Sequence, residues 1–198
     1  MATDYAQLTA NLCSFYDFTD KVVLLVGAAG RQLLDSTAGT RKLIAIDKDF
    51  AAIRELQGII AAKGLQSSME AIAADFADLT LPCGTVYFEF CLHEMDDPAK
   101  ALRHAKTLAP DVVVYDHSPG SEWIYYGAEE DKVARSAAVM ERFGIRRHQA
   151  FHAQQSFATF AELLRKVSPQ GPLAVERVQR FAGSTNIVIP MSYELNLF

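Results

Sequence analysis

Residues 22–30 read Val-Val-Leu-Leu-Val-Gly-Ala-Ala-Gly, and residues 44–47 read Ile-Ala-Ile-Asp. An apolar run without polar alternation predicts a strand that is buried on both faces. The small residues 27–30 predict a tight turn into a helix, where backbone N–H groups approach a ligand closely. Asp47 ends a second apolar run about 20 residues on, where a carboxylate can bind both hydroxyls of a ribose. The two stretches predict half of a nucleotide-binding α/β unit.

The rest of the chain continues this alternation of strands and helices. Strands are expected at residues 21–26, 43–46, 69–73, 85–90 and 112–115, and helices at 3–16, 30–38, 50–63 and 97–108. Later segments are expected to form helices at 123–141 and 157–167, a strand or loop at 145–155, and a hairpin from strands 173–181 and 186–193. We therefore expect an α/β fold with a doubly wound, mostly parallel seven-stranded sheet (Rossmann-like) and a C-terminal antiparallel hairpin.

Composition bounds the class of protein. The chain has 198 residues, half of them hydrophobic, which suits a single domain over residues 1–198. The net charge of −5, without a cluster of Lys and Arg, makes a nucleic-acid partner unexpected. Three cysteines without a C-x-x-C spacing disfavour a disulfide framework or a structural zinc site. Without a signal peptide or a membrane-length apolar run, we expect a cytoplasmic protein with no membrane span.

From about Lys21 to Tyr193 the chain is similar to the class I S-adenosylmethionine-dependent methyltransferases, and it most resembles their small-molecule branch, which includes quinone-ring methyltransferases. The resemblance implies S-adenosyl-L-methionine as cofactor. It implies that Asp47 binds the ribose, that Asp75 bonds the adenine amine, and that Phe76 packs on the adenine ring. The implied cofactor site consists of Gly27, Ala28, Ala29, Gly30, Asp47, Lys48, Asp75, Phe76 and Phe90.

Three positions depart from the family pattern. Leu25 stands where the family usually has an acid, two residues before its first glycine. Ala29 and Arg31 stand where a second and a third glycine are common. An aspartate after a strand also serves as a helix cap or a turn former, so each carboxylate keeps that alternative.

Residues that follow the fourth and fifth expected strands are candidates for the chemistry. His93 and His117 are candidate general bases or orienting groups because histidine titrates near neutral pH, and Asp116 could orient His117. His93 could instead bond a backbone carbonyl at the strand end, and Asp116 and His117 could instead both face the substrate. Residues 121–160 are expected to cover the substrate and residues 1–20 to form a helical cap. Candidate substrate contacts are Trp123, Tyr126 and His152, with packing in the core as the alternative for the aromatic pair.

A group of acids and histidines also invites a metal interpretation: His93, Glu94, Asp116, His117, Glu129, Glu130, His148 and His152. His148 and His152 are four residues apart but not in a predicted helix, and no H-E-x-x-H motif is present. We therefore assign no metal ligand from the sequence.

The expected activity is S-adenosylmethionine-dependent methyl transfer to a small-molecule acceptor. One alternative is an enzyme that keeps the fold but performs divergent chemistry, assisted by a divalent metal. A nicotinamide-dependent oxidoreductase is another, although G-x-G-x-x-G is absent. A third is a non-catalytic S-adenosylmethionine-binding or partner protein, which the residues Leu25 and Arg31 favour. The sequence leaves the acceptor and the oligomeric state open, a homodimer included.

Overall fold

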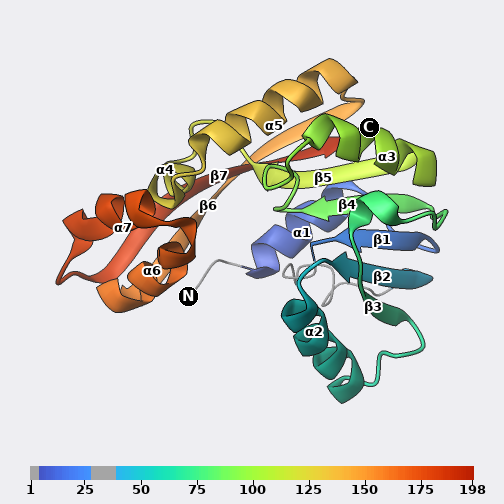
Figure 1. The fold of residues 1–198 in the computed structure, drawn as a ribbon, viewed down its shortest axis with the longest axis horizontal. Coiled ribbons are helices and arrows are strands. Elements are labelled where there is room, and N and C mark those ends of the chain that lie inside the picture. Colours follow the sequence, from blue (N-terminus) through green and yellow to red (C-terminus); the bar gives the residue numbers. More distant parts are fainter. Residues whose placement is uncertain (1–4, 28–38) are drawn as a thin grey trace.

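The computed structural model describes residues 5–27 and 39–198. A seven-stranded sheet in the order β3-β2-β1-β4-β5-β7-β6 forms its centre (Figure 1). The first five strands are parallel to one another, and β7 is antiparallel to both β5 and β6. The strands are β1 (Val22–Val26), β2 (Lys42–Asp47), β3 (Met69–Ala73), β4 (Thr85–Glu89), β5 (Asp111–His117), β6 (Arg147–Thr159) and β7 (Thr185–Leu197). The predicted mostly parallel sheet with an antiparallel C-terminal pair is confirmed.

Helices cover both faces of this sheet. The α-helices are α1 (Tyr5–Phe15), α2 (Phe50–Ala62), α3 (Pro98–Leu108), α4 (Glu122–Gly127), α5 (Glu130–Phe143), α6 (Phe160–Val167) and α7 (Pro172–Val178). Short 3-10 helices are η1 (Phe76–Asp78), η2 (Ser168–Gln170) and η3 (Gln179–Phe181). The helix expected at residues 30–38 lies outside the described residues.

The parallel strands are apolar at consecutive positions because their alternate side chains enter two different cores. Leu25 of β1 packs in the core that α1 and α2 cover, whereas Leu24 packs in the core that α3 covers. All five residues of β4 are buried, which follows from its position between β1 and β5.

Aspartates cap the starts of two of the α-helices. The Asp49 side chain accepts from the backbone N–H groups of Ala51 and Ala52 at the start of α2. Asp97 accepts from Lys100 N at the start of α3, whose first residue is Pro98. A proline at the first helical position loses no helical hydrogen bond, so this start is encoded locally. No helix among residues 5–27 and 39–198 has the length and apolarity needed to cross a membrane.

The long strands β6 and β7 reach beyond the sheet. Residues 193–197 of β7 pair with both β5 and β6, whereas residues 185–192 pair with β6 alone. Helices α4, α6 and α7 gather around this two-stranded extension and form a lobe with it (Figure 1). The lobe stands beside the carboxyl ends of the parallel strands.

The position predicted for one hairpin strand is wrong. Residues 173–181 form α7 and η3. β7 pairs instead with β6, which includes most of the segment 145–155 for which the sequence did not distinguish a strand from a loop. Ala174 and Val178 are four residues apart and both buried, which is helical spacing, and Pro172 starts the helix. The helix expected at 157–167 begins only at Phe160, because residues up to Thr159 continue β6.

Candidate active site

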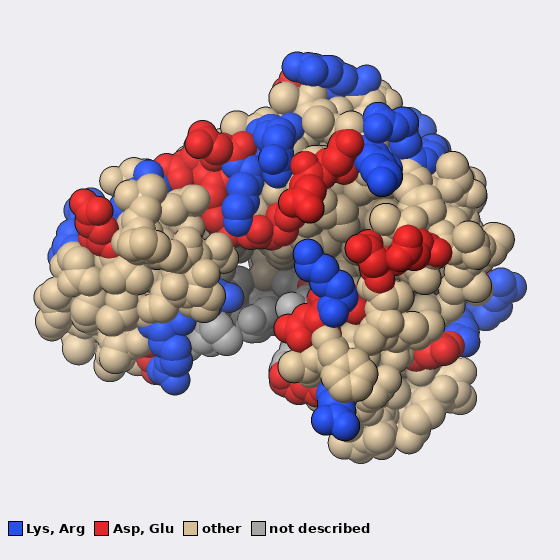
Figure 2. All heavy atoms as spheres, viewed as in Figure 1, with Lys and Arg blue, Asp and Glu red and all other residues tan. Residues whose placement is uncertain are grey.

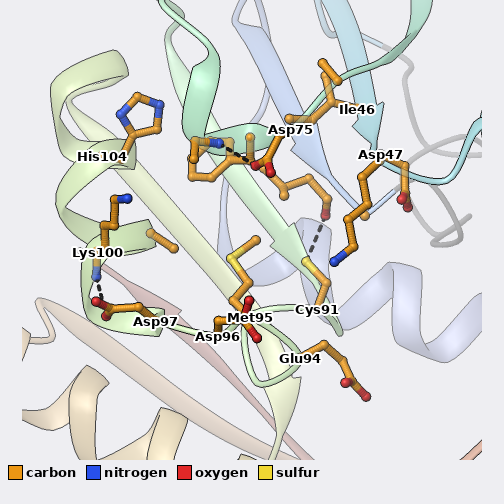
Figure 3. A pocket seen from close by; sticks show the side chains of 17 residues that line it. Ile46, Asp47, Asp75, Cys91, Glu94, Met95, Asp96, Asp97, Lys100 and His104 are labelled. Carbon is orange, nitrogen blue, oxygen red and sulfur yellow. Dashed lines mark hydrogen bonds between the residues drawn. The ribbon is translucent and has the colours of Figure 1, made fainter.

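A pocket of about 520 Å³ lies at the carboxyl ends of the parallel strands (Figure 3). Its lining residues come from the ends of β1 and β2, from the segments after β3 and β4, and from the first turns of α3. Its carboxylates are Asp47, Asp75, Glu94, Asp96 and Asp97, and its lysines are Lys48 and Lys100. In the space-filling view, Asp and Glu side chains, with Lys and Arg between them, border the hollow in the middle of the molecule (Figure 2). A ligand here meets acceptors from several separate elements.

Gly27 turns the chain at the end of β1, and no larger residue fits without strain. Its φ is +91°, in the region that favours glycine. A Cβ at this position would lie 3.1 Å from both Cβ and Sγ of Cys91. The Cys91 thiol donates to Val26 O at 3.1 Å, and Gly27 N donates to Ile46 O at 3.0 Å. Residues Ala28, Ala29 and Gly30, which complete the predicted turn, lie outside the described residues.

Asp47 and Asp75 each make a local turn and face the same pocket (Figure 3). Asp47 Oδ1 accepts from Asp49 N at 2.8 Å, and Asp75 Oδ1 accepts from Ala77 N at 2.9 Å as the cap of η1. The capping role and the ligand-facing role are therefore compatible, because a carboxylate has two oxygens. Lys48 lines the same pocket.

Phe76 forms an apolar wall of the pocket. It is mostly buried and packs edge-on against Phe88 and His104, with ring centroids 5.3 and 5.0 Å away. His104 also lines the pocket, and its buried Nε2 has no hydrogen-bond partner within the described part of the chain. Sequence reasoning missed His104, because its position on α3 carries no motif.

His93 and Asp116 form a buried pair next to Glu94, which lines the pocket. His93 Nδ1 lies 2.5 Å from Asp116 Oδ1, and His93 N donates to Asp116 Oδ2 at 3.0 Å. Burial opposes the charged ring, but the carboxyls of Asp116 and Glu94 outweigh it and raise the pKa of His93 to about 10. Asp116 thus orients His93, whereas the sequence suggested that it orients His117.

His117 lies beside this pair, with its ring centroid 5.6 Å from that of His93. Burial lowers the pKa of His117 to about 4, so its ring is neutral at pH 7. Its Nδ1 has no hydrogen-bond partner among the residues that the structure describes. Phe90, with a φ of +48°, packs against His117 and Tyr115 and does not line the pocket.

Glu94 lines the pocket and joins a second set of polar groups. Its Oε1 lies 3.6 Å from His93 Nε2, and its Oε2 accepts from Lys132 Nζ at 2.6 Å. A ring nitrogen of His93, a carboxylate oxygen of Glu94 and a carboxylate oxygen of Glu129 lie within 4.8 Å of one another. Contacts with the His93 ring lower the pKa of Glu94 well below its usual range. Burial and the Glu94 carboxyl raise the pKa of Glu129 to about 7.

Asp116 and His117 of the sequence-derived metal group lie beside His93, whereas Glu130, His148 and His152 have partners outside this cluster. Glu130 pairs with Arg177 at 2.6 Å, and His148 lies 3.3 Å from Glu194. His152 Nδ1 lies 3.2 Å from Ser192 Oγ on the β6–β7 pair.

The aromatic candidates for substrate contact pack inside the lobe. Trp123 stacks on Phe157 at 5.8 Å, and Tyr126 meets Phe181 edge-on at 5.2 Å. Both are buried, and neither lines the pocket. Their contact with an acceptor, like that of His152, stays a prediction.

Comparison with known proteins agrees with this architecture. No protein-family model matches the chain, and no curated protein matches it in sequence. A solved S-adenosylmethionine-dependent methyltransferase from Aquifex aeolicus superposes with a TM-score of 0.62 and 16% identity, over 98% of this chain and 89% of that one. A candidate methyltransferase from Bacillus halodurans C-125 gives 0.67 and 15%, over 98% and 97%. The cyclase SpnF gives 0.59 and 13%, over 96% and 79%. The chain therefore has the α/β, Rossmann-like fold of these methyltransferases. SpnF, which is described as a cyclase, shares this fold.

Proposed function

We propose that this chain binds S-adenosyl-L-methionine in the pocket at the strand ends and transfers its methyl group to a small-molecule acceptor. The observation that carries the proposal is that Gly27, Asp47 and Asp75, from three separate strand ends, line one pocket. A volume of about 520 Å³ is within the range of cofactor sites, which is about 300–1,000 Å³.

The residues fit the parts of the cofactor. Asp47 presents a fixed carboxylate to the two ribose hydroxyls. Asp75 accepts from the adenine amine while Phe76 packs on the ring. Gly27 lets the backbone approach the methionine part, where a side chain would collide with Cys91. Bound in this way, the cofactor would supply a methyl group that is attached to a sulfonium. The sulfur leaves as a neutral thioether, so no further activation of the leaving group is needed.

The acceptor is then bound at the Glu94 side of the pocket. His93, Asp116 and His117 lie behind Glu94 and are the groups that would orient an acceptor or hold its proton. We assign most of the rate to holding the acceptor in line with the methyl group in a crevice from which water is excluded. Residues 121–160 and helix α1 are the proposed cover, and the quinone-ring likeness makes a flat ring the first acceptor to try.

Calorimetric titration with S-adenosylhomocysteine tests the cofactor site. Asp47→Asn and Asp75→Asn keep the shape of each side chain and remove its charge. Each should weaken binding by about 10- to 100-fold, since a hydrogen bond to a charged group is worth about 1.5–3 kcal/mol. Asp78→Asn is the matched control, because Asp78 is exposed beside Asp75 and does not line the pocket. If the folded wild-type protein does not bind at millimolar ligand, the proposal is wrong.

Isotope-labelled S-adenosylmethionine tests the transfer itself. Label recovered in the small-molecule fraction of an extract supports the proposed acceptor class, whereas label in RNA or protein contradicts it.

One specific observation favours a rival function, that of a protein that binds the cofactor without transferring its methyl group. Leu25 is fully buried between Ala45 and Tyr87, so no carboxylate stands at the position where the family usually has an acid. Tight binding of S-adenosylhomocysteine without any transfer would support that rival.

A further inference from the structure

We propose that His93, Glu94 and Glu129 bind a divalent first-row transition-metal ion at the edge of the pocket where Glu94 lies. Mn²⁺ serves as the probe of this site in the experiment below. The ligand atoms are His93 Nε2, Glu94 Oε1 and one carboxylate oxygen of Glu129. They come from the segment after β4 and from the turn between α4 and α5. The site does not depend on methyl transfer, since it uses none of the proposed ribose or adenine contacts.

The spacing of the ligand atoms suits an ion better than a direct contact. His93 Nε2 and Glu94 Oε1 face each other at 3.6 Å, which is longer than an N–H···O hydrogen bond. Two ligands that are each about 2.0–2.2 Å from one ion lie roughly 3–4 Å apart at ordinary coordination angles. The selected ligand atoms of all three residues lie within 4.8 Å of one another, so small rotamer adjustments bring them to one ion.

Two of the three ligands already have the supporting contacts that metal ligands need. Asp116 holds His93 Nδ1 at 2.5 Å, which leaves Nε2 directed at the carboxylates. This carboxylate–histidine arrangement is the usual support of a metal-bound imidazole. Lys132 binds Glu94 Oε2 at 2.6 Å and leaves Oε1 on the side of His93.

Glu129 is the buried carboxyl of the cluster. The residue is only 6% exposed, and its side chain bonds the carboxyl of Glu94, which also interacts with Lys132 and His93. A buried carboxylate opposite another carboxylate needs a proton or a cation between them. The backbone also makes room for it, since a Cβ at Gly127 would lie 3.1 Å from Glu129 Oε2.

Charge balance favours a cation of charge two. Metal binding at His93 Nε2 displaces the proton that the ring otherwise carries, and the cation also takes the place of a proton between the two glutamates. With the ring neutral and both glutamates ionised, the carboxylates of Glu94, Glu129 and Asp116 and the ammonium of Lys132 leave two negative charges. One nitrogen and two oxygen ligands suit Mn²⁺, Fe²⁺ or Zn²⁺ better than Mg²⁺ or Ca²⁺. Three protein ligands leave a coordination position for water or an acceptor oxygen. Because the ligand Glu94 also lines the pocket, a molecule bound in the pocket could reach the open coordination position of the ion.

Mn²⁺ titration of the chelator-treated full chain, followed by electron paramagnetic resonance, tests the site. We expect one tightly bound ion per chain. Asp116→Asn, which removes the charge that supports the His93 ring but no metal ligand, should weaken Mn²⁺ binding by about 10- to 100-fold. Glu94→Gln and Glu129→Gln, which remove ligand oxygens, should weaken it at least as much. Glu122→Gln is the matched control, because Glu122 is exposed on α4 and is not part of the cluster.

Two results would overturn the metal site: absence of stoichiometric Mn²⁺ binding, or equal Mn²⁺ affinity in the wild type and in Glu94→Gln. Glu94 is 40% exposed, so this variant remains folded and informative even where Glu129→Gln unfolds. Titration with S-adenosylhomocysteine on the same preparations separates the two proposals. Metal binding without S-adenosylhomocysteine binding would contradict the proposed function alone, and the reverse would contradict the metal site alone.

Discussion

At the scale of single residues, Gly27 meets two demands at once. Its positive φ turns the chain from β1 toward the pocket, and its lack of a Cβ leaves space for Cys91 of the neighbouring strand end. The thiol in turn donates to the carbonyl just before this turn, so Cys91 has a packing role that needs no thiol chemistry. Burial raises the pKa of the Cys91 thiol well above its usual value, which agrees with that role.

Replacement of Gly27 therefore has a predictable cost. Gly27→Ala should lower the free energy of unfolding by about 1–3 kcal/mol, because the new Cβ adds backbone strain and a collision. Urea unfolding measures this change. Gly58→Ala is the matched control: Gly58 lies in α2 with open space around its Cα, so alanine should stabilise by about 0.5–1 kcal/mol. Equal effects of the two substitutions would contradict this account of the turn.

At the scale of elements, Asp111 ties three segments together at the start of β5. Tyr16, just after α1, donates its hydroxyl to Asp111 Oδ2 at 2.6 Å. Lys21, before β1, lies 3.4 Å from the same oxygen, and Arg146, before β6, lies 2.6 Å from Oδ1. Burial opposes the charge of Asp111, but these donors outweigh it and lower its pKa.

This carboxylate should make stability depend on pH at the acid end. A carboxyl whose pKa is lower in the folded state stabilises the fold above its unfolded pKa. That contribution is lost as the pH falls through the folded pKa. Urea unfolding between about pH 5 and about pH 2 should therefore show a shallower loss of stability in Asp111→Asn than in the wild type. Asp78→Asn should retain the wild-type slope, and an unchanged slope in Asp111→Asn would refute the assignment.

At the scale of the whole molecule, the sheet is unevenly protected. β4 lies between two parallel strands and is buried throughout, whereas β6 forms the edge and its residues 147–150 are exposed. Toward the lobe, the sheet continues as only two strands, residues 185–192 of β7 and the part of β6 that pairs with them (Figure 1). We therefore expect the lobe and the body of the sheet to differ in local stability.

Hydrogen exchange should resolve this difference. Amides of β4 and β5 should exchange only through global unfolding, whereas those of residues 151–159 and 185–192 should exchange faster through local opening. Mass spectrometry of peptides from the two regions provides the measurement. Added S-adenosylhomocysteine should slow exchange at residues 74–77 and 91–97, which line the pocket or adjoin it. Equal protection across the sheet would argue against separate local stabilities.

The sequence by itself determined the parallel half of the fold and the outline of the pocket. Strands buried on both faces leave continuous apolar runs, and the caps at Asp49 and Asp97 act on their own helices, so both signals are local. The carboxyl ends of parallel strands converge, which is why the sequence alone predicts that Asp47 and Asp75 share a pocket.

Only the tertiary structure decided the partner of β7 and the membership of the polar cluster. β6 is exposed at residues 147–150, and only every second residue between Phe151 and Phe157 faces the core, so its short apolar signal did not identify the distant segment with which it pairs. Glu129 reaches His93 and Glu94 because α4 ends in a left-handed turn at Ala128 and α5 starts directly after it. Contacts between residues far apart in the chain leave no periodicity in the sequence, so packing alone brings these three side chains together.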